Sequence, residues 1–122
     1  MLTFEESEIA LDEIARELPD AIFARLNGGY VLTHETMTDA NGLYILGQYH
    51  VQPNGLGRYI TVHYGSIFEI YGHLSEKSFR KKLKHVLHHE LVHHLESLAG
   101  DKSLEIQDEI DKARYLGLLP RD

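Results

Sequence analysis

Histidines are concentrated in one part of the chain, because five of the nine fall between His85 and His94. Within this run, residues 89–93 read His-Glu-Leu-Val-His and match the pattern H-E-x-x-H. Histidines four residues apart lie about 40° from each other around a helix, so both rings can bind one zinc ion at about 2.0–2.1 Å. We therefore expect His89 and His93 to bind Zn²⁺. Glu90, beside them, is expected to be the catalytic residue, a general base that takes a proton from water.

A catalytic zinc ion needs a third protein ligand, and the chain offers several candidates. Glu96 follows His89 by almost two helical turns and His93 by about one turn, so it lies on the same helix face. Helical side chains lean toward the N-terminus, which would carry this carboxylate toward the ion. We expect Glu96 to be the third ligand. The alternatives are acidic residues that follow the helix, namely Asp101, Glu105, Asp108 and Glu109.

The histidine run also has a purely structural explanation. Its rings could form a solvated polar face in which Glu90 pairs with His94, four residues later. Against this, a helical projection places Glu90 inside the apolar stripe, where a carboxylate without a role is costly. Structural roles fit the four histidines outside the run, namely His34, His50, His63 and His73.

The motif requires a long helix, and the sequence predicts one from Ser75 to Ala99. Ser75 is a good N-cap residue, and Gly100 is a typical helix end. Apolar residues recur at helical spacing and form one stripe: Phe79, Leu83, Val86, Leu87, Leu91 and Leu98. Within this helix, the basic run at residues 80–84 is expected to lie on the solvated side rather than to bind nucleic acid.

Further helices are expected at both ends of the chain. Thr3 and Glu6 match a capping box, which predicts a helix from Phe4 to Leu18, ended by Pro19. A short helix should follow at residues 21–26, with Asp20 as its cap. A last helix should begin near Asp101 or Ser103 and end at 118–120, with one apolar face formed by Ile106, Ile110 and Ala113.

Three strands should lie between these helices, at Tyr30–His34, Leu43–Val51 and Arg58–Tyr64. The last two flank a turn with Asn-Gly and should pair antiparallel. Residues 67–71 fit either a short strand or a helical turn. Because His63 and Tyr64 lie on the strand that comes before the long helix, they are the residues outside the motif helix best placed to face the site, where either could stabilise an oxyanion.

Composition restricts the number of domains, the kinds of partner and the metal ligands that this chain can have. A chain of 122 residues with 43% apolar residues fits one domain spanning 1–122. The net charge of −7 argues against a nucleic-acid partner, and the lack of cysteine excludes disulfides and thiolate ligands. No apolar run is long enough to span a membrane. The acidic first residues do not resemble a secretory signal, so we expect a cytoplasmic protein. Composition leaves the oligomeric state open.

Beyond the motif, most of the chain resembles the small bacterial zincin-like metallopeptidases, also called minimal zincins. The matching stretches are residues 26–29, 44–50, 55–60, 64–66, 71–75 and 89–100. This resemblance implies a zincin-like α+β fold, in which a small, mostly antiparallel sheet packs on the motif helix and its edge strand borders the cleft. It also implies zinc on His89 and His93, with Glu90 as base. Many relatives continue the motif as H-x-x-G-x-x-D, where this chain has Glu96 and Ala99.

Two functions follow. The first is a zinc-dependent peptidase that acts on a peptide or protein substrate, with the strand Arg58–Tyr64 as the edge that binds an extended peptide. The second is a non-catalytic metal-binding or protein-interaction module on the same fold. A metal ion with an open coordination position would favour the enzyme, and a closed site would favour the module.

Overall fold

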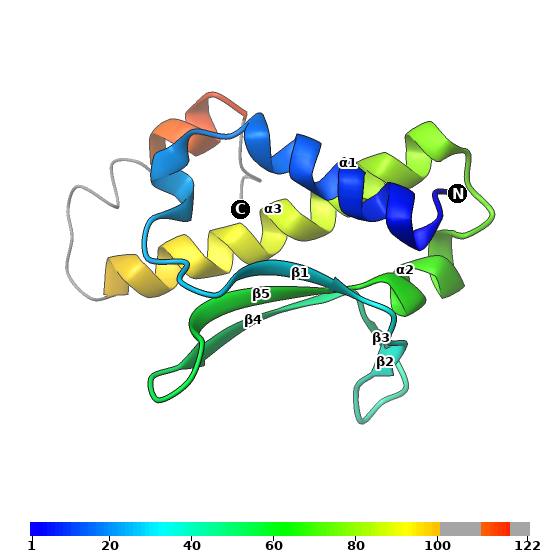
Figure 1. Ribbon diagram of the computed structural model, residues 1–122, viewed down its shortest axis with the longest axis horizontal. Coiled ribbons are helices and arrows are strands. Elements are labelled where there is room, and N and C mark those ends of the chain that lie inside the picture. The colour runs from blue at the N-terminus through cyan, green and yellow to red at the C-terminus, as the bar shows by residue number, and fades with distance from the viewer. Residues whose placement is uncertain (101–110, 118–122) are drawn as a thin grey trace.

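The computed structural model describes residues 1–100 and 111–117, which form an α+β fold (Figure 1). The elements in chain order are α1 (Phe4–Arg16), the 3₁₀ helix η1 (Asp20–Phe23), β1 (Gly29–Thr33), β2 (Met37–Thr38), β3 (Tyr44–Ile45), β4 (Gly47–Gln52), β5 (Gly57–His63), α2 (Tyr64–Tyr71) and α3 (Glu76–Gly100). Residues 111–115 are also helical. None of the helices in the described part of the chain is long and apolar enough to cross a membrane.

The main sheet has the strand order β1-β5-β4. β4 and β5 form the expected antiparallel hairpin, whereas β1 pairs with β5 in parallel. The sheet is therefore mixed: the expected antiparallel pairing is present, and β1 adds a parallel pair that the sequence did not indicate. The expected strand Leu43–Val51 is also divided at Leu46: β3 pairs with β2 in a separate two-stranded ribbon, and β4 joins the main sheet. Alternating side chains specify a strand but not its neighbour, so the sequence could not reveal either feature.

Helix boundaries agree closely with local sequence signals. Thr3 and Glu6 form both hydrogen bonds of the capping box at the start of α1, which ends two residues before the predicted Leu18. The Ser75 hydroxyl accepts the backbone N–H of Ser78 at the start of α3. The undecided segment 67–71 belongs to the helix α2. Of the predicted last helix, residues 101–110 and 118–122 lie outside the described residues, while Ala113 is buried.

One hydrophobic cluster lies between the sheet and the helices. Figure 1 shows α1, α3 and residues 111–117 on the same side of the sheet. Ile60 and Val62 point from the central strand β5 into this cluster. All six residues of the predicted stripe on α3 are buried, namely Phe79, Leu83, Val86, Leu87, Leu91 and Leu98. The stripe therefore fixes which face of α3 meets the sheet, and so which residues of the motif face away from it.

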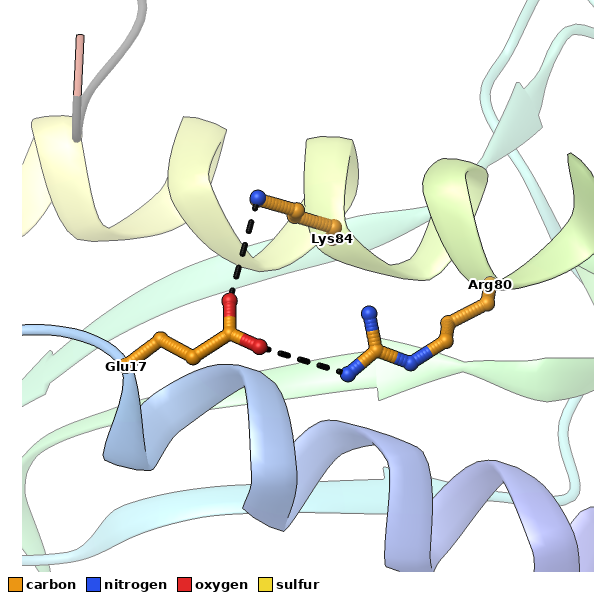
Figure 2. A network of polar contacts seen from close by, with 3 residues as sticks. All are labelled: Glu17, Arg80 and Lys84. Carbon is orange, nitrogen blue, oxygen red and sulfur yellow. Dashed lines mark ion pairs between the residues drawn. The ribbon is translucent and has the colours of Figure 1, made fainter. Parts of the chain in front are cut away.

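The basic run at residues 80–84 lies on the outer side of α3, as predicted, except for the buried Leu83. Figure 2 shows Glu17, just after α1, between two of these cations. Its carboxylate lies 3.6 Å from Arg80 and 3.9 Å from Lys84. Such exposed pairs contribute little stability, about 0–1 kcal/mol each, so the apolar residues that α1 and α3 share in the core are the main contacts between the two helices.

Candidate metal centre and cleft

His89 and His93 lie on the exposed face of α3, one turn apart. Their Nε2 atoms are 3.1 Å apart, and the two rings are nearly perpendicular. Two nitrogens that bind a tetrahedral zinc ion at 2.0–2.1 Å are separated by about 3.3 Å. The helix therefore holds both rings at a spacing that fits one shared zinc ion.

Glu90 is almost completely buried, with 6% of its surface exposed. Burial raises the pKa of its carboxyl group, while nearby His93 lowers it. The side chain lines two cavities, so it is accessible from a cleft although little of it is exposed. A buried carboxylate at a cavity wall, next to a pair of histidines, can accept a proton from a molecule held in that cavity.

The two cavities lie side by side between α3 and the strand β4. The smaller has a volume of about 310 Å³ and is lined by Ile45, Leu46, Gly47, His85, Val86, His89 and Glu90. The larger has a volume of about 690 Å³ and is lined by Gln48, Tyr49, Val51, Glu90, His93, Glu96 and Ser97. Glu90 belongs to both linings, and each cavity receives one histidine of the pair. Together they form a cleft along one edge of the sheet.

The edge strand at this cleft is β4, not Arg58–Tyr64 as predicted. In the described residues, the strand β5 is central, with β1 on one side and β4 on the other. The His63 N–H donates to the Leu46 carbonyl, so alternate residues from Leu46 onward bond to β5. The backbone N–H and C=O groups of Gly47, Tyr49 and Val51 therefore point to the free edge. The prediction failed because hairpin pairing does not tell which of its two strands receives a further neighbour.

Gly47 brings the cleft's two walls together. A Cβ atom at this position would lie 2.8 Å from Val86 Cγ1 and 3.2 Å from Glu90 Cγ. The first distance is too short for two non-bonded carbon atoms, so a side chain at position 47 would force Val86 or the strand to move. Only glycine lets β4 approach α3 this closely, so Gly47 sets the distance between the strand edge and Glu90.

Tyr49 and His94 connect the same two walls. His94 is fully buried, and its Nε2–H donates to the Ala24 carbonyl at 2.8 Å. Its Nδ1 must then accept the Tyr49 hydroxyl, 2.9 Å away, and this hydroxyl in turn accepts Arg58. The alternative in which Glu90 pairs with His94 is therefore wrong. Sequence reasoning overlooked Tyr49, although the alternation of Gly47, Tyr49 and Val51 places all three on one face.

His63 and Tyr64 do not face the cleft, so their predicted role at an oxyanion is wrong. His63 points to the opposite face of the sheet, where it bonds to Thr33 and Gln48. The Tyr64 hydroxyl donates to the backbone carbonyl of Leu2. Residues that alternate along β5 reach opposite faces, and Val62, not His63, points toward α3.

Two other histidines outside the run also make structural contacts. His34 stacks on Phe4, with ring centroids 3.6 Å apart. His50 stacks on Tyr59 and bonds to the Thr61 hydroxyl. These contacts agree with the structural roles that we expected for both.

A third metal ligand does not emerge from the described residues. Among residues 1–100 and 111–117, no three histidine, aspartate or glutamate side chains lie close enough together to hold one ion. Glu96 is exposed and shares the larger cavity with His93, but its carboxylate does not complete a group with the histidine pair. The competing Asp101, Glu105, Asp108 and Glu109 lie outside the described residues.

Comparison with known proteins found similarity to a solved structure but no matching family or curated protein. The chain is similar to a solved structure of a conserved hypothetical protein from Thermus thermophilus, with 29% sequence identity and a TM-score of 0.69. The match covers 82% of this chain and all of that one. Because the matched protein is described as hypothetical, the likeness supports the α+β fold and leaves the activity to be argued from the site.

Proposed function

We propose that this chain is a zincin-like metallopeptidase, in which His89 and His93 bind Zn²⁺ and Glu90 is the general base. One observation carries the proposal: the Nε2 atoms of the histidine pair lie 3.1 Å apart beside a buried carboxylate that lines a cleft. A polar face of solvated histidines would not require Glu90 to be buried, because a buried carboxylate is costly unless it has a partner or a role.

Each of these groups has a distinct part in hydrolysis. Zinc, when bound, polarises the peptide carbonyl and lowers the pKa of water. Glu90 accepts a proton from the attacking water and passes it to the nitrogen of the leaving amine. Apolar side chains beside this carboxylate, among them Ile45, Leu46 and Val86, lower the local dielectric constant and so strengthen its interaction with the proton.

An extended peptide substrate would pair with the free edge of β4. Gly47 and Tyr49 offer backbone N–H and C=O groups there, beside Glu90. Main-chain pairing of this kind gives affinity without sequence preference, because every peptide has the same backbone. The fixed approach of β4 to α3 at Gly47 then brings the paired peptide close to the base.

A cleavage assay with metal analysis tests the proposal. The zinc-loaded protein is incubated with a reduced, alkylated and therefore unfolded protein substrate, and the products are mapped by mass spectrometry. Glu90→Gln should keep zinc but slow cleavage about 10²–10⁴-fold, because an amide cannot accept the proton. Cleavage at the wild-type rate by this variant would contradict the proposal. Loss of zinc from it would make Glu90 a ligand instead.

A non-catalytic metal-binding or protein-interaction module is the second candidate. It is favoured by the lack of a three-ligand group among residues 1–100 and 111–117. A wild-type protein that holds about one zinc ion per chain, yet leaves the unfolded substrate intact, would select this candidate.

A further inference from the structure

The strand β4 is fixed against α3 at two points, and the second is a hydrogen bond. At Gly47 the strand and the helix are already in contact, since an added Cβ would lie 2.8 Å from Val86 Cγ1. Two residues further along, the Tyr49 hydroxyl lies 2.9 Å from His94 Nδ1. Two residues of a strand span about 6.5 Å. One contact would leave β4 free to tilt about it, whereas two contacts fix both its distance from α3 and its angle to the helix.

The hydrogen bond between Tyr49 and His94 belongs to a network in which each donor has one direction. Arg58 donates to the Tyr49 hydroxyl at 2.9 Å, and His94 Nε2–H donates to the Ala24 carbonyl at 2.8 Å. The tyrosine oxygen therefore accepts from one side and gives its own proton to His94 Nδ1 on the other. His94 is fully buried, so the loss of this hydroxyl would leave a buried acceptor without a donor.

The same network fixes the orientation of the helix that carries the histidine pair. His94 directly follows His93 in α3, and both nitrogens of the His94 ring are bonded to other parts of the fold. The helix therefore cannot turn about its axis without breaking one of these bonds. Arg58 also donates to the Ser97 hydroxyl, about one turn further along α3. The network thus joins α3, β4 and β5 beside the larger cavity, whose lining includes Tyr49 and Ser97.

We propose that Tyr49 and His94 are positioning residues, which hold the free edge of β4 at a fixed distance and angle from Glu90. The Tyr49 hydroxyl has one proton, and this proton is held by His94, so it is not available to a substrate. The role of the bond is therefore to set where a peptide paired with β4 lies. This inference rests on the proposed function, because hydrolysis requires the peptide and the base to be held in a fixed geometry.

Tyr49→Phe tests the role of the bond, because it removes one hydroxyl and keeps the ring. The substrate is a peptide that spans a site cleaved by the wild type in the unfolded protein. Zinc content should stay at about one ion per chain, since both histidine ligands belong to α3. kcat should fall at least ~10-fold, because a misplacement of about 1 Å can slow a reaction ~10²-fold. KM should change less than ~3-fold, since the backbone groups at the β4 edge are unchanged. A kcat within about 2-fold of the wild type would overturn the inference.

Tyr30→Phe is the matched control. The Tyr30 hydroxyl donates to Asp12 at 2.8 Å, and so joins β1, on the other side of β5, to the helix α1. This variant loses the same hydroxyl and the same kind of strand-to-helix bond, but away from the cleft. It should keep the wild-type kcat. An equal fall of kcat in both variants would mean that the sheet loosens as a whole, which contradicts a specific role of Tyr49.

Two substitutions of His94 separate its two hydrogen bonds. An asparagine side chain ends near the position of Nδ1, so His94→Asn can still accept from Tyr49. A glutamine side chain reaches the position of Nε2, so His94→Gln can still donate to Ala24 but no longer accepts from Tyr49. kcat should therefore fall in His94→Gln and stay near the wild-type value in His94→Asn. The reverse order would assign the role to the contact with Ala24 and overturn the inference.

The double variant Tyr49→Phe/His94→Gln completes the comparison. It should be no slower than either single variant, because both substitutions remove the same hydrogen bond. Independent losses that multiply in the double variant would contradict a shared role. Tyr49→Phe with its control decides the question alone if a His94 variant does not fold.

NMR relaxation dispersion separates the inference from the proposed function. It measures the μs–ms motion of the backbone amides of residues 47–51 in the zinc-loaded protein. These amides should show exchange in Tyr49→Phe and none in the wild type or in Tyr30→Phe. Such exchange, in a protein that cleaves no peptide, would support the positioning of β4 and refute the peptidase. Slower cleavage by Tyr49→Phe without this exchange would mean that Tyr49 touches the substrate, which refutes the positioning and leaves the peptidase proposal intact.

Discussion

Two pairs of histidines lie on opposite sides of the sheet and differ in what their ring nitrogens contact. His89 and His93 project from α3, which covers one face, and their Nε2 atoms have only each other among the hydrogen bonds of the described residues. His50 and His63 lie on the other face, where their nitrogens are engaged by Thr33, Gln48 and Thr61. Under the proposed function, the difference means that proximity of two imidazoles is not sufficient for zinc binding. The nitrogens must also converge and lack competing partners.

Removing one imidazole ring from each pair should give the largest difference, measured as zinc content. His93→Ala should reduce zinc from about one ion per chain to almost none, because one imidazole cannot replace the pair. His63→Gln should keep the zinc, since that ring already bonds to protein side chains. Elemental analysis of both purified variants measures this. Equal zinc content in the two would place the metal elsewhere, for instance on His85 with His89.

Glu96→Ala tests whether Glu96 is the third zinc ligand beside the His89–His93 pair. If Glu96 is the third ligand, its loss should weaken zinc binding by more than the ~10–100-fold typical of a residue that only supports a ligand. Competition with a chromogenic zinc chelator measures the affinity. Asp101→Ala is the comparison, because Asp101 is the main competing candidate. Unchanged affinity in both variants would move the third ligand to Glu105 or Asp108, or to water.

A smaller effect is expected from acid on protein stability, through His63 of the other pair. Burial lowers the pKa of His63, while Glu35 acts in the opposite direction and His50 in the same one. In the unfolded chain His63 takes up a proton near pH 6.5, whereas in the folded protein it does so only at lower pH. The contribution of His63 to the free energy of unfolding is therefore fully present above this pH and is lost as the pH falls. The loss is at most about 1.4 kcal/mol per pH unit.

Urea unfolding at pH 7.5 and pH 5.5, with a chelator present, measures this contribution. The free energy of unfolding of His63→Gln should fall less between these two pH values than that of the wild type, because glutamine does not titrate. An equal fall in both proteins would mean that His63 is protonated as easily in the folded state as in the unfolded one.

Local sequence patterns predicted the parts of the candidate site that one helix contains. The apolar stripe of α3 is buried as expected, and the N-cap residue Ser75 accepts the expected hydrogen bond. The convergence of His89 and His93 follows from the same helical spacing. These features depend on residues within one or two turns of each other, so the sequence alone determines them.

Contacts between distant segments were decided only by the tertiary structure. The sequence did not reveal that β1 joins β5 in parallel, that β4 is the free edge, or that His94 receives the hydroxyl of Tyr49, 45 positions earlier in the chain. A period of two assigns each residue of a strand to one of two faces, but which face meets α3 and which strand lies next depend on the packing of the whole core. The sequence thus determined the paired imidazoles and the carboxylate beside them. The tertiary structure determined the cleft, because its second wall comes from a strand that only the folded sheet brings to α3.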